Sequence, residues 1–131
     1  MHKLPAPFIA ASIWFLSSQP LLPQPPGIFG SDKLQHVLVY AALAFTAGLW
    51  APPHFWKRRP ITALLLAALV SSAYGALDEV HQYHVPGRTC DIQDWLADTL
   101  GAFVGAAGML VVMRLRCGNR RIQTKIKNDR D

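Results

Sequence analysis

The segment GALDEVHQYHVPGRTCDIQDWLADTLG, residues Gly75–Gly101, gathers ionisable side chains between two strongly apolar runs. It contains five carboxylates, two histidines and one arginine, whereas the runs that overlap its ends, Pro60–Leu77 and Thr99–Met113, carry no Asp, Glu, Lys or Arg. The Pro-Gly pair at its centre is typical of a turn. We therefore expect two apolar helices that are joined by a polar connection containing a turn.

Only 16% of the chain is charged, below the ~25% usual for soluble domains, and further apolar runs occupy residues 7–22 and Leu34–Trp56. A helix that crosses a bilayer needs about 20 mostly apolar residues. In chain order, the second run (Leu34–Trp56) and the third (Pro60–Leu77) reach that length. The fourth (Thr99–Met113) does so if its helix begins near Ile92 and includes Asp94 and Asp98. The first is shorter, and a signal peptide is its alternative interpretation, although no A-x-A-type cleavage site follows it. The sequence thus predicts an all-α fold, a four-helix transmembrane bundle.

The basic residues predict the orientation of this bundle. With four spans placed, 11 of the 13 Lys and Arg residues fall on one side, and only Lys33 and Arg88 fall on the other. By the positive-inside rule, both termini are cytoplasmic. The basic tail then fixes the orientation and touches anionic lipid, so we expect the lipid bilayer as a partner and no nucleic acid. The chain divides into a first transmembrane helix with a Pro-rich outer loop (1–27), three transmembrane helices (28–113) and a basic cytoplasmic tail (114–131). Within the second part, Ala51–Pro60 is predicted to be a short basic loop, because prolines bound it.

Acidic side chains gather on the predicted outer side of the membrane. Six carboxylates stand there against two cations, which leaves a formal charge of −4. Ionisable groups within a membrane usually pair with one another or face a watery cavity. Either some carboxylates are protonated, or histidines are charged, or a cation binds. The acids are Asp32, Asp78, Glu79, Asp91, Asp94 and Asp98, and the histidines beside them are His36, His81 and His84.

Helical spacing predicts that these polar side chains converge. Asp32, His36 and Tyr40 are spaced i, i+4, i+8 and form one stripe. In the next long helix, Asp78 shares a face with either His81 or Gln82. A capping box that begins at Asp32 is the ordinary alternative for that residue. Small residues at three- and four-residue steps favour close packing of the last helix: Ala97, Gly101, Gly105 and Gly108.

Four motifs, in this order, resemble the VanZ-like family over about residues 28–112. They are D-K-x-x-H-x-x-x-Y from Asp32 to Tyr40, D-E-x-x-Q from Asp78 to Gln82, P-G-R at 86–88, and D-x-x-x-D-x-x-G from Asp94 to Gly101. The resemblance implies a small multi-pass protein of the bacterial plasma membrane. Members that resemble the family's namesake are linked to low-level resistance to teicoplanin, which acts at the cell envelope. The family usually has Asn at the position of Asp98, so this chain carries an additional acid there.

Two non-enzymatic functions fit these residues. In the first, an outer-face pocket binds a lipid or cell-wall head group, and Arg88, Lys33 and His36 donate hydrogen bonds to its phosphate or carboxylate. In the second, the polar residues are structural, and the carboxylates pair with Lys33 and Arg88 across the helix ends and lock the bundle. The binding residues predicted for the pocket are Asp32, Lys33, His36, Tyr40, Asp78, Glu79, Gln82, Arg88, Asp94 and Asp98.

A third hypothesis is an enzyme that acts on a lipid-linked phosphate. A divalent cation as cofactor would bridge the acids and the phosphate, with Asp78, Glu79 and Asp94 as its candidate ligands. His36 would act as general base or phosphate partner, and Arg88 would stabilise developing charge. The signatures H-E-x-x-H and G-x-S-x-G are both absent from the sequence. The catalytic candidates are His36, Asp78, Glu79 and Arg88.

Overall fold

The computed structural model describes residues 4–20 and 31–128, and the side chains of Ser31, Asp32 and residues 117–128 lie outside the described set. The described residues form five α-helices, one short 3₁₀ helix and no strand, which confirms the all-α prediction. The elements are α1 (Pro5–Ser17), α2 (Ser31–Ala47), η1 (Gly48–Trp50), α3 (Pro53–Arg58), α4 (Pro60–Gln82) and α5 (Ile92–Asn128).

Two helices, α4 and α5, are long and apolar enough to cross a membrane. α4 has 23 residues and begins at Pro60. Proline is favoured at this position because the backbone N–H that it lacks would have no partner within the helix. α5 begins at Ile92, as predicted, because the Asp91 carboxylate accepts the Gln93 N–H at 2.8 Å and caps the helix. Only 33% of the apolar window of α4 is buried, so most of its apolar side chains face outward.

The other two predicted spans are shorter than expected within the described residues. α1 has 13 residues, or about 20 Å at 1.5 Å per residue, and α2 has 17 residues, or about 25 Å. The hydrocarbon core of a bilayer is about 30 Å thick. Two helices of membrane-spanning length are therefore established, and the full four-helix transmembrane bundle stays a prediction.

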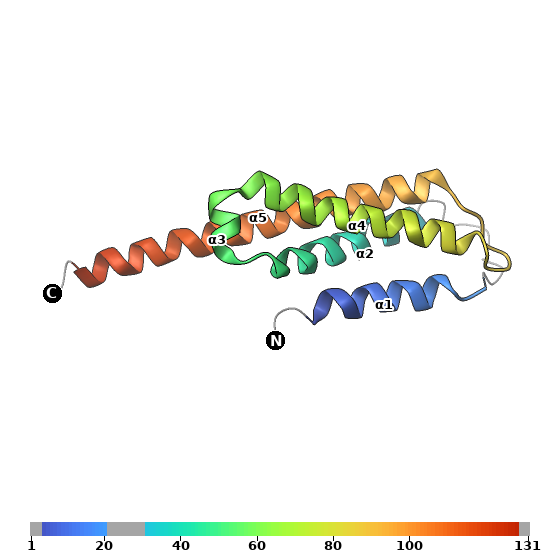
Figure 1. Cartoon of the computed structure of the whole chain (residues 1–131), viewed down its shortest axis with the longest axis horizontal. Coiled ribbons are helices and arrows are strands. Elements are labelled where there is room, and N and C mark those ends of the chain that lie inside the picture. Colours follow the sequence, from blue (N-terminus) through green and yellow to red (C-terminus); the bar gives the residue numbers. More distant parts are fainter. Residues whose placement is uncertain (1–3, 21–30, 129–131) are drawn as a thin grey trace.

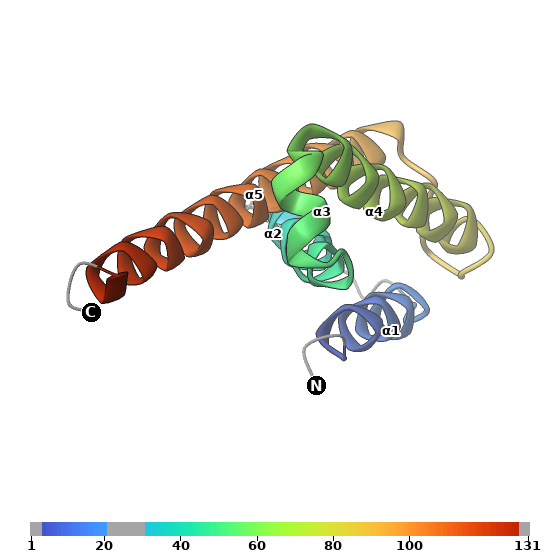
Figure 2. The ribbon, with the colours of Figure 1, turned by 60° about the vertical axis from the view of Figure 1, so that its left-hand side comes forward.

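The long helices lie side by side, with α2 packed along α5 and α4, and α1 set against α2 and α4 (Figures 1 and 2). The C-terminal ends of α1 and α4 meet the N-terminal ends of α2 and α5, and we call this end of the bundle the polar end. From there α5 runs the length of the bundle and continues beyond it to Asn128 (Figure 1). The polar end therefore receives side chains from four helices.

Close packing of α2 on α5 depends on two glycines. A Cβ at Gly101 would collide with the backbone of Val37, and one at Gly105 with the backbone of Ala41. Gly108 is different, because a Cβ there would meet only the Phe45 ring at an ordinary 3.6 Å. The predicted small-residue packing is thus confirmed for the first two glycines, and it brings the two backbones into direct contact.

The prediction that Ala51–Pro60 is only a loop is wrong, because six of these residues form α3. Pro53 occupies the first turn of that helix, where proline is favoured, instead of breaking it. Trp56 is 2% exposed, and its Nε1–H donates to the Gly48 carbonyl at 2.9 Å. Burial of this one indole holds the short helix against α4 and α5.

Candidate functional site

The outermost contacts at the polar end are ion pairs between α2 and the start of α5. The Lys33 ammonium pairs with Asp91, at 3.2 Å, and with Asp94. The Gln93 N–H and the Lys33 ammonium both stabilise the charged Asp91 carboxylate, in that order of strength, so they lower its pKa below the ordinary value. Lys33, in the first turn of its helix, is thus compensated by acids of another helix.

Beneath these ion pairs lies a buried group of three side chains from three helices. His36 of α2 donates through Nδ1 to the Asp98 Oδ1 of α5 at 2.8 Å. Glu79 of α4 accepts the backbone N–H of Asp91 through Oε2 at 2.9 Å. One donor atom from each of His36, Glu79 and Asp98 lies within 4.8 Å of the other two. Asp98 is 0% and Glu79 3% exposed, although both are ionisable.

A second buried carboxylate system joins α1 to α4. Asp78 accepts the Ser17 hydroxyl at 2.6 Å and the Gln82 amide at 2.9 Å. Arg88 donates to the Gln82 side chain at 3.3 Å and to the backbone carbonyls of Leu16 and Gln19. The guanidinium therefore caps the C-terminal end of α1, and among the described side chains it pairs with no carboxylate, contrary to the structural hypothesis.

A polar cavity of about 170 Å³ opens beside these groups. Its lining combines cationic, acidic and neutral polar side chains with the apolar inner face of α1. Tyr40 forms part of the wall, and its hydroxyl is buried without a hydrogen-bond partner among the described residues. The polar lining residues are Ser17, Gln35, His36, Tyr40, Asp78, Gln82 and Arg88.

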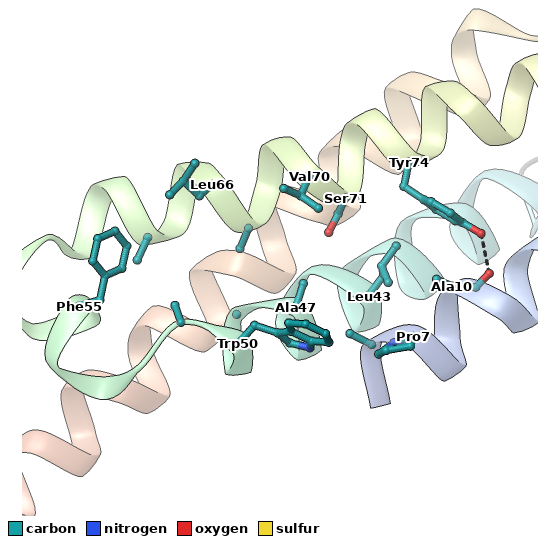
Figure 3. Close-up of a pocket in the computed structure, with 15 residues that line it drawn as sticks. Pro7, Ala10, Leu43, Ala47, Trp50, Phe55, Leu66, Val70, Ser71 and Tyr74 are labelled. Carbon is teal, nitrogen blue, oxygen red and sulfur yellow. Dashed lines mark hydrogen bonds between the residues drawn. The ribbon is translucent and has the colours of Figure 1, made fainter. Parts of the chain in front are cut away.

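A second, apolar cavity of about 470 Å³ lies further along the same face of α1 (Figure 3). Leu66 and Val70 of α4 line it, together with Leu43 of α2, Trp50 and small residues of α1. The Tyr74 hydroxyl donates to the Ala10 carbonyl at 2.6 Å at the edge of this cavity nearest the polar end (Figure 3). The apolar cavity is thus separate from the polar one, with which it shares no lining residue.

Most of the predicted site residues lie at the polar end, but the structure divides them. The outer ion pair is formed by Lys33 and Asp94. The buried group consists of His36, Glu79 and Asp98. The link to α1 is formed by Asp78, Gln82 and Arg88. Tyr40 lies beside the buried group, and the Asp32 side chain lies outside the described residues. Of the predicted metal ligands Asp78, Glu79 and Asp94, only Glu79 belongs to the three-residue group.

Sequence reasoning missed Ser17, although a pattern pointed to it. Ala6, Ala10, Ile13 and Ser17 repeat at four, three and four residues and form the inward stripe of α1. Ser17 is the only polar member of this stripe. A hydroxyl on an otherwise apolar helix face is a signal for a buried polar partner.

These features define a small helical protein with two membrane-length apolar helices and a buried polar centre at one end of the bundle. The model of the VanZ/LLP1 family matches residues 7–114, and the chain belongs to this family. The match includes α1 as well as the three helices in which the motifs were recognised. Searches among curated proteins and among solved structures found no match.

Proposed function

We propose that this protein is a multi-pass protein of the bacterial plasma membrane that binds an amphiphile of the envelope, a lipid or a lipid-linked cell-wall precursor, at its outer face. The polar end would face outward and both termini would lie in the cytoplasm, the orientation that the distribution of Lys and Arg favours. The observation that carries the proposal is the polar cavity, because it places a cation beside hydrogen-bonding groups at the end of an apolar bundle.

Arg88 is the residue suited to an anionic head group. A guanidinium has five N–H donors, and three of them are used in the contacts with Gln82, Leu16 and Gln19. These contacts fix the plane of the guanidinium, and the remaining donors are available for a phosphate or carboxylate. Lys33 is less suited to this role because Asp91 and Asp94 already compensate its charge.

The apolar cavity supports an amphiphile rather than a free anion. Both cavities are lined by the inward stripe of α1, the apolar one at Ala10 and the polar one at Ile13. A head group at Arg88 would allow an attached hydrocarbon chain to lie along α1 toward the apolar walls of the second cavity. In a bilayer such a chain is already surrounded by apolar groups, so its fit in the cavity would contribute van der Waals packing rather than hydrophobic free energy.

The test is to identify what the full-length protein carries after purification in a mild detergent. Mass spectrometry of the extract should find one enriched amphiphile with a phosphate or carboxylate. The matched variants are Arg88→Gln, in the polar cavity, and Arg58→Gln, in the last turn of α3 at the other end of the bundle. Loss of a hydrogen bond to a charged group costs about 1.5–3 kcal/mol, so Arg88→Gln should retain at most about a tenth of the amphiphile.

Two outcomes would reject the proposal. One is a purified wild type with no enriched amphiphile, and the other is equal retention by the Arg88 and Arg58 variants. Circular dichroism must show native helix content in both variants, because Arg88 also caps α1.

In a susceptible Gram-positive host, wild-type expression should raise the inhibitory concentration of teicoplanin more than Arg88→Gln does, if the bound amphiphile is the drug's cell-wall precursor.

A further inference from the structure

Three oxygens at the polar end are buried and have no hydrogen-bond partner among the described residues. They are Glu79 Oε1, Asp98 Oδ2 and the Tyr40 hydroxyl. Buried polar atoms are nearly always paired, so an unpaired one calls for a partner such as water or an ion. Two of these three atoms belong to the group of His36, Glu79 and Asp98, whose donor atoms lie within 4.8 Å of one another.

We propose that His36, Glu79 and Asp98 bind one divalent transition-metal ion between α2, α4 and α5. This set differs from the three acids that the sequence suggested, because Asp78 and Asp94 are occupied by other contacts. The site stands on its own contacts and does not require that a head group binds in the polar cavity.

Charge balance favours a metal ion over the protein's own cations. Two carboxylates, of Glu79 and Asp98, are almost completely buried here, and His36 is the one side chain described in contact with them that can carry a positive charge. Lys33 reaches the outer acids Asp91 and Asp94 instead. Buried charges are costly unless they are paired or coordinate a metal. A divalent ion would neutralise both carboxylates and leave His36 uncharged.

A proton on Glu79 is the alternative to a metal ion. Oε2 accepts the Asp91 N–H, and Oε1 receives no hydrogen bond from any described donor. A proton on Oε1 would neutralise one of the two buried carboxylates and leave the other to His36. A divalent ion between the three side chains would instead supply a partner to both carboxylates, so metal analysis distinguishes the two states.

The distances and the donor set suit a small ion. His36 Nδ1 and Asp98 Oδ1 are 2.8 Å apart, close to the roughly 3 Å between adjacent ligands on an ion with bonds of about 2.1 Å. The proton that they share would leave when the metal binds. One imidazole with two carboxylates favours Zn²⁺ or Mn²⁺, whereas Ca²⁺ requires six to eight oxygens. Three protein ligands also leave a position open, as in catalytic zinc sites.

The surrounding residues hold these ligands in place and give the ion a route of entry. A Cβ at Gly75 would lie 2.9 Å from Asp98 Oδ2 and 3.2 Å from the Tyr40 ring, so the glycine allows α4 to approach the carboxylate. His36 also lines the polar cavity, through which an ion can reach the group. The open coordination position would then be available to water or to an anionic ligand in that cavity.

The test uses the full-length protein without a polyhistidine tag, stripped with EDTA and equilibrated with Zn²⁺. After desalting, metal analysis should find one Zn²⁺ retained per wild-type chain. Glu79→Gln and Asp98→Asn preserve side-chain shape and should bind Zn²⁺ at least about tenfold more weakly. Asp94→Asn is the matched control, because this acid lies one turn further out on α5 and pairs with Lys33, and it should retain the ion.

Co²⁺ gives a measurement that needs no variant. Bound to the wild-type protein in place of Zn²⁺, it should develop the intense visible absorption of a low-symmetry four- or five-coordinate site. If Glu79→Gln and Asp98→Asn fail to fold, this spectrum decides the question. The proposal is overturned if the wild type retains no Zn²⁺ and gives only the weak spectrum of aqueous Co²⁺. It is equally overturned if the folded variants bind as well as the wild type, or if Asp94→Asn alone abolishes binding.

Discussion

Gly105 makes the contact between α2 and α5 directly testable. A Cβ at this position would lie 2.0 Å from the carbonyl oxygen and 2.7 Å from the carbonyl carbon of Ala41, both backbone atoms that cannot rotate away. Ordinary contacts begin at 3.4 Å, so Gly105→Ala must move the Cβ and the Ala41 oxygen apart by about 1.4 Å. Gly108→Ala, one turn further along the same helix, places its Cβ at 3.6 Å from Phe45 and requires no movement.

Comparison of the two variants isolates how much the close contact between α2 and α5 changes the free energy of unfolding. Both gain about 1 kcal/mol of helix propensity, whereas only Gly105→Ala incurs the ~1–3 kcal/mol cost of an overpacked core. Gly105→Ala should therefore be less stable than Gly108→Ala by about 1–3 kcal/mol, and Gly108→Ala at least as stable as the wild type. Thermal unfolding of the helical signal in detergent should separate the variants by about 3–5 °C per kcal/mol. Equal unfolding temperatures would refute the close approach of the two backbones.

The remaining predictions concern the attachment of α1 and the orientation of the chain. Ser17→Ala removes the hydroxyl that donates to buried Asp78 and should lower stability by about 1–3 kcal/mol in the same unfolding assay. Ser12→Ala, whose hydroxyl only reaches its own helix, should change it by less than about 0.5 kcal/mol, and equal effects would contradict the role of Asp78. In a Cys117→Ser chain, an impermeant maleimide should label exposed Cys90 in intact spheroplasts, and labelling only in inside-out vesicles would reverse the proposed orientation.

The sequence was sufficient for the features that depend on local pattern. The start of α5 follows from the Asp91 cap, and the meeting of His36 with Asp98 follows from helical spacing in two spans that both begin at the same side and run parallel. Close packing at Gly101 follows from the spacing of small residues. Each of these needs only the chain direction and the period of a helix.

Other features depend on how helices rotate against one another, which a single sequence does not encode in any local pattern. The acids Asp78 and Glu79 are adjacent in sequence, yet one faces α1 and the other faces α2 and α5. The partner of Arg88 proved to be the end of α1, which its place in a Pro-Gly turn did not suggest. The short helix α3 was missed because proline at a helix start was interpreted as a break.

The uninterrupted length of α5 has a mechanical consequence. Its 37 residues form a rod of about 55 Å, nearly twice the thickness of a hydrocarbon core. Its first turns carry Asp94 and Asp98, and its last turns extend past every other helix of the bundle (Figure 1). A tilt of about 10° around the acidic end would displace the far end by about 10 Å for a rod of this length. A small change in the contacts of Asp94 and Asp98 would thus be enlarged at the other end of this helix, which carries the basic residues.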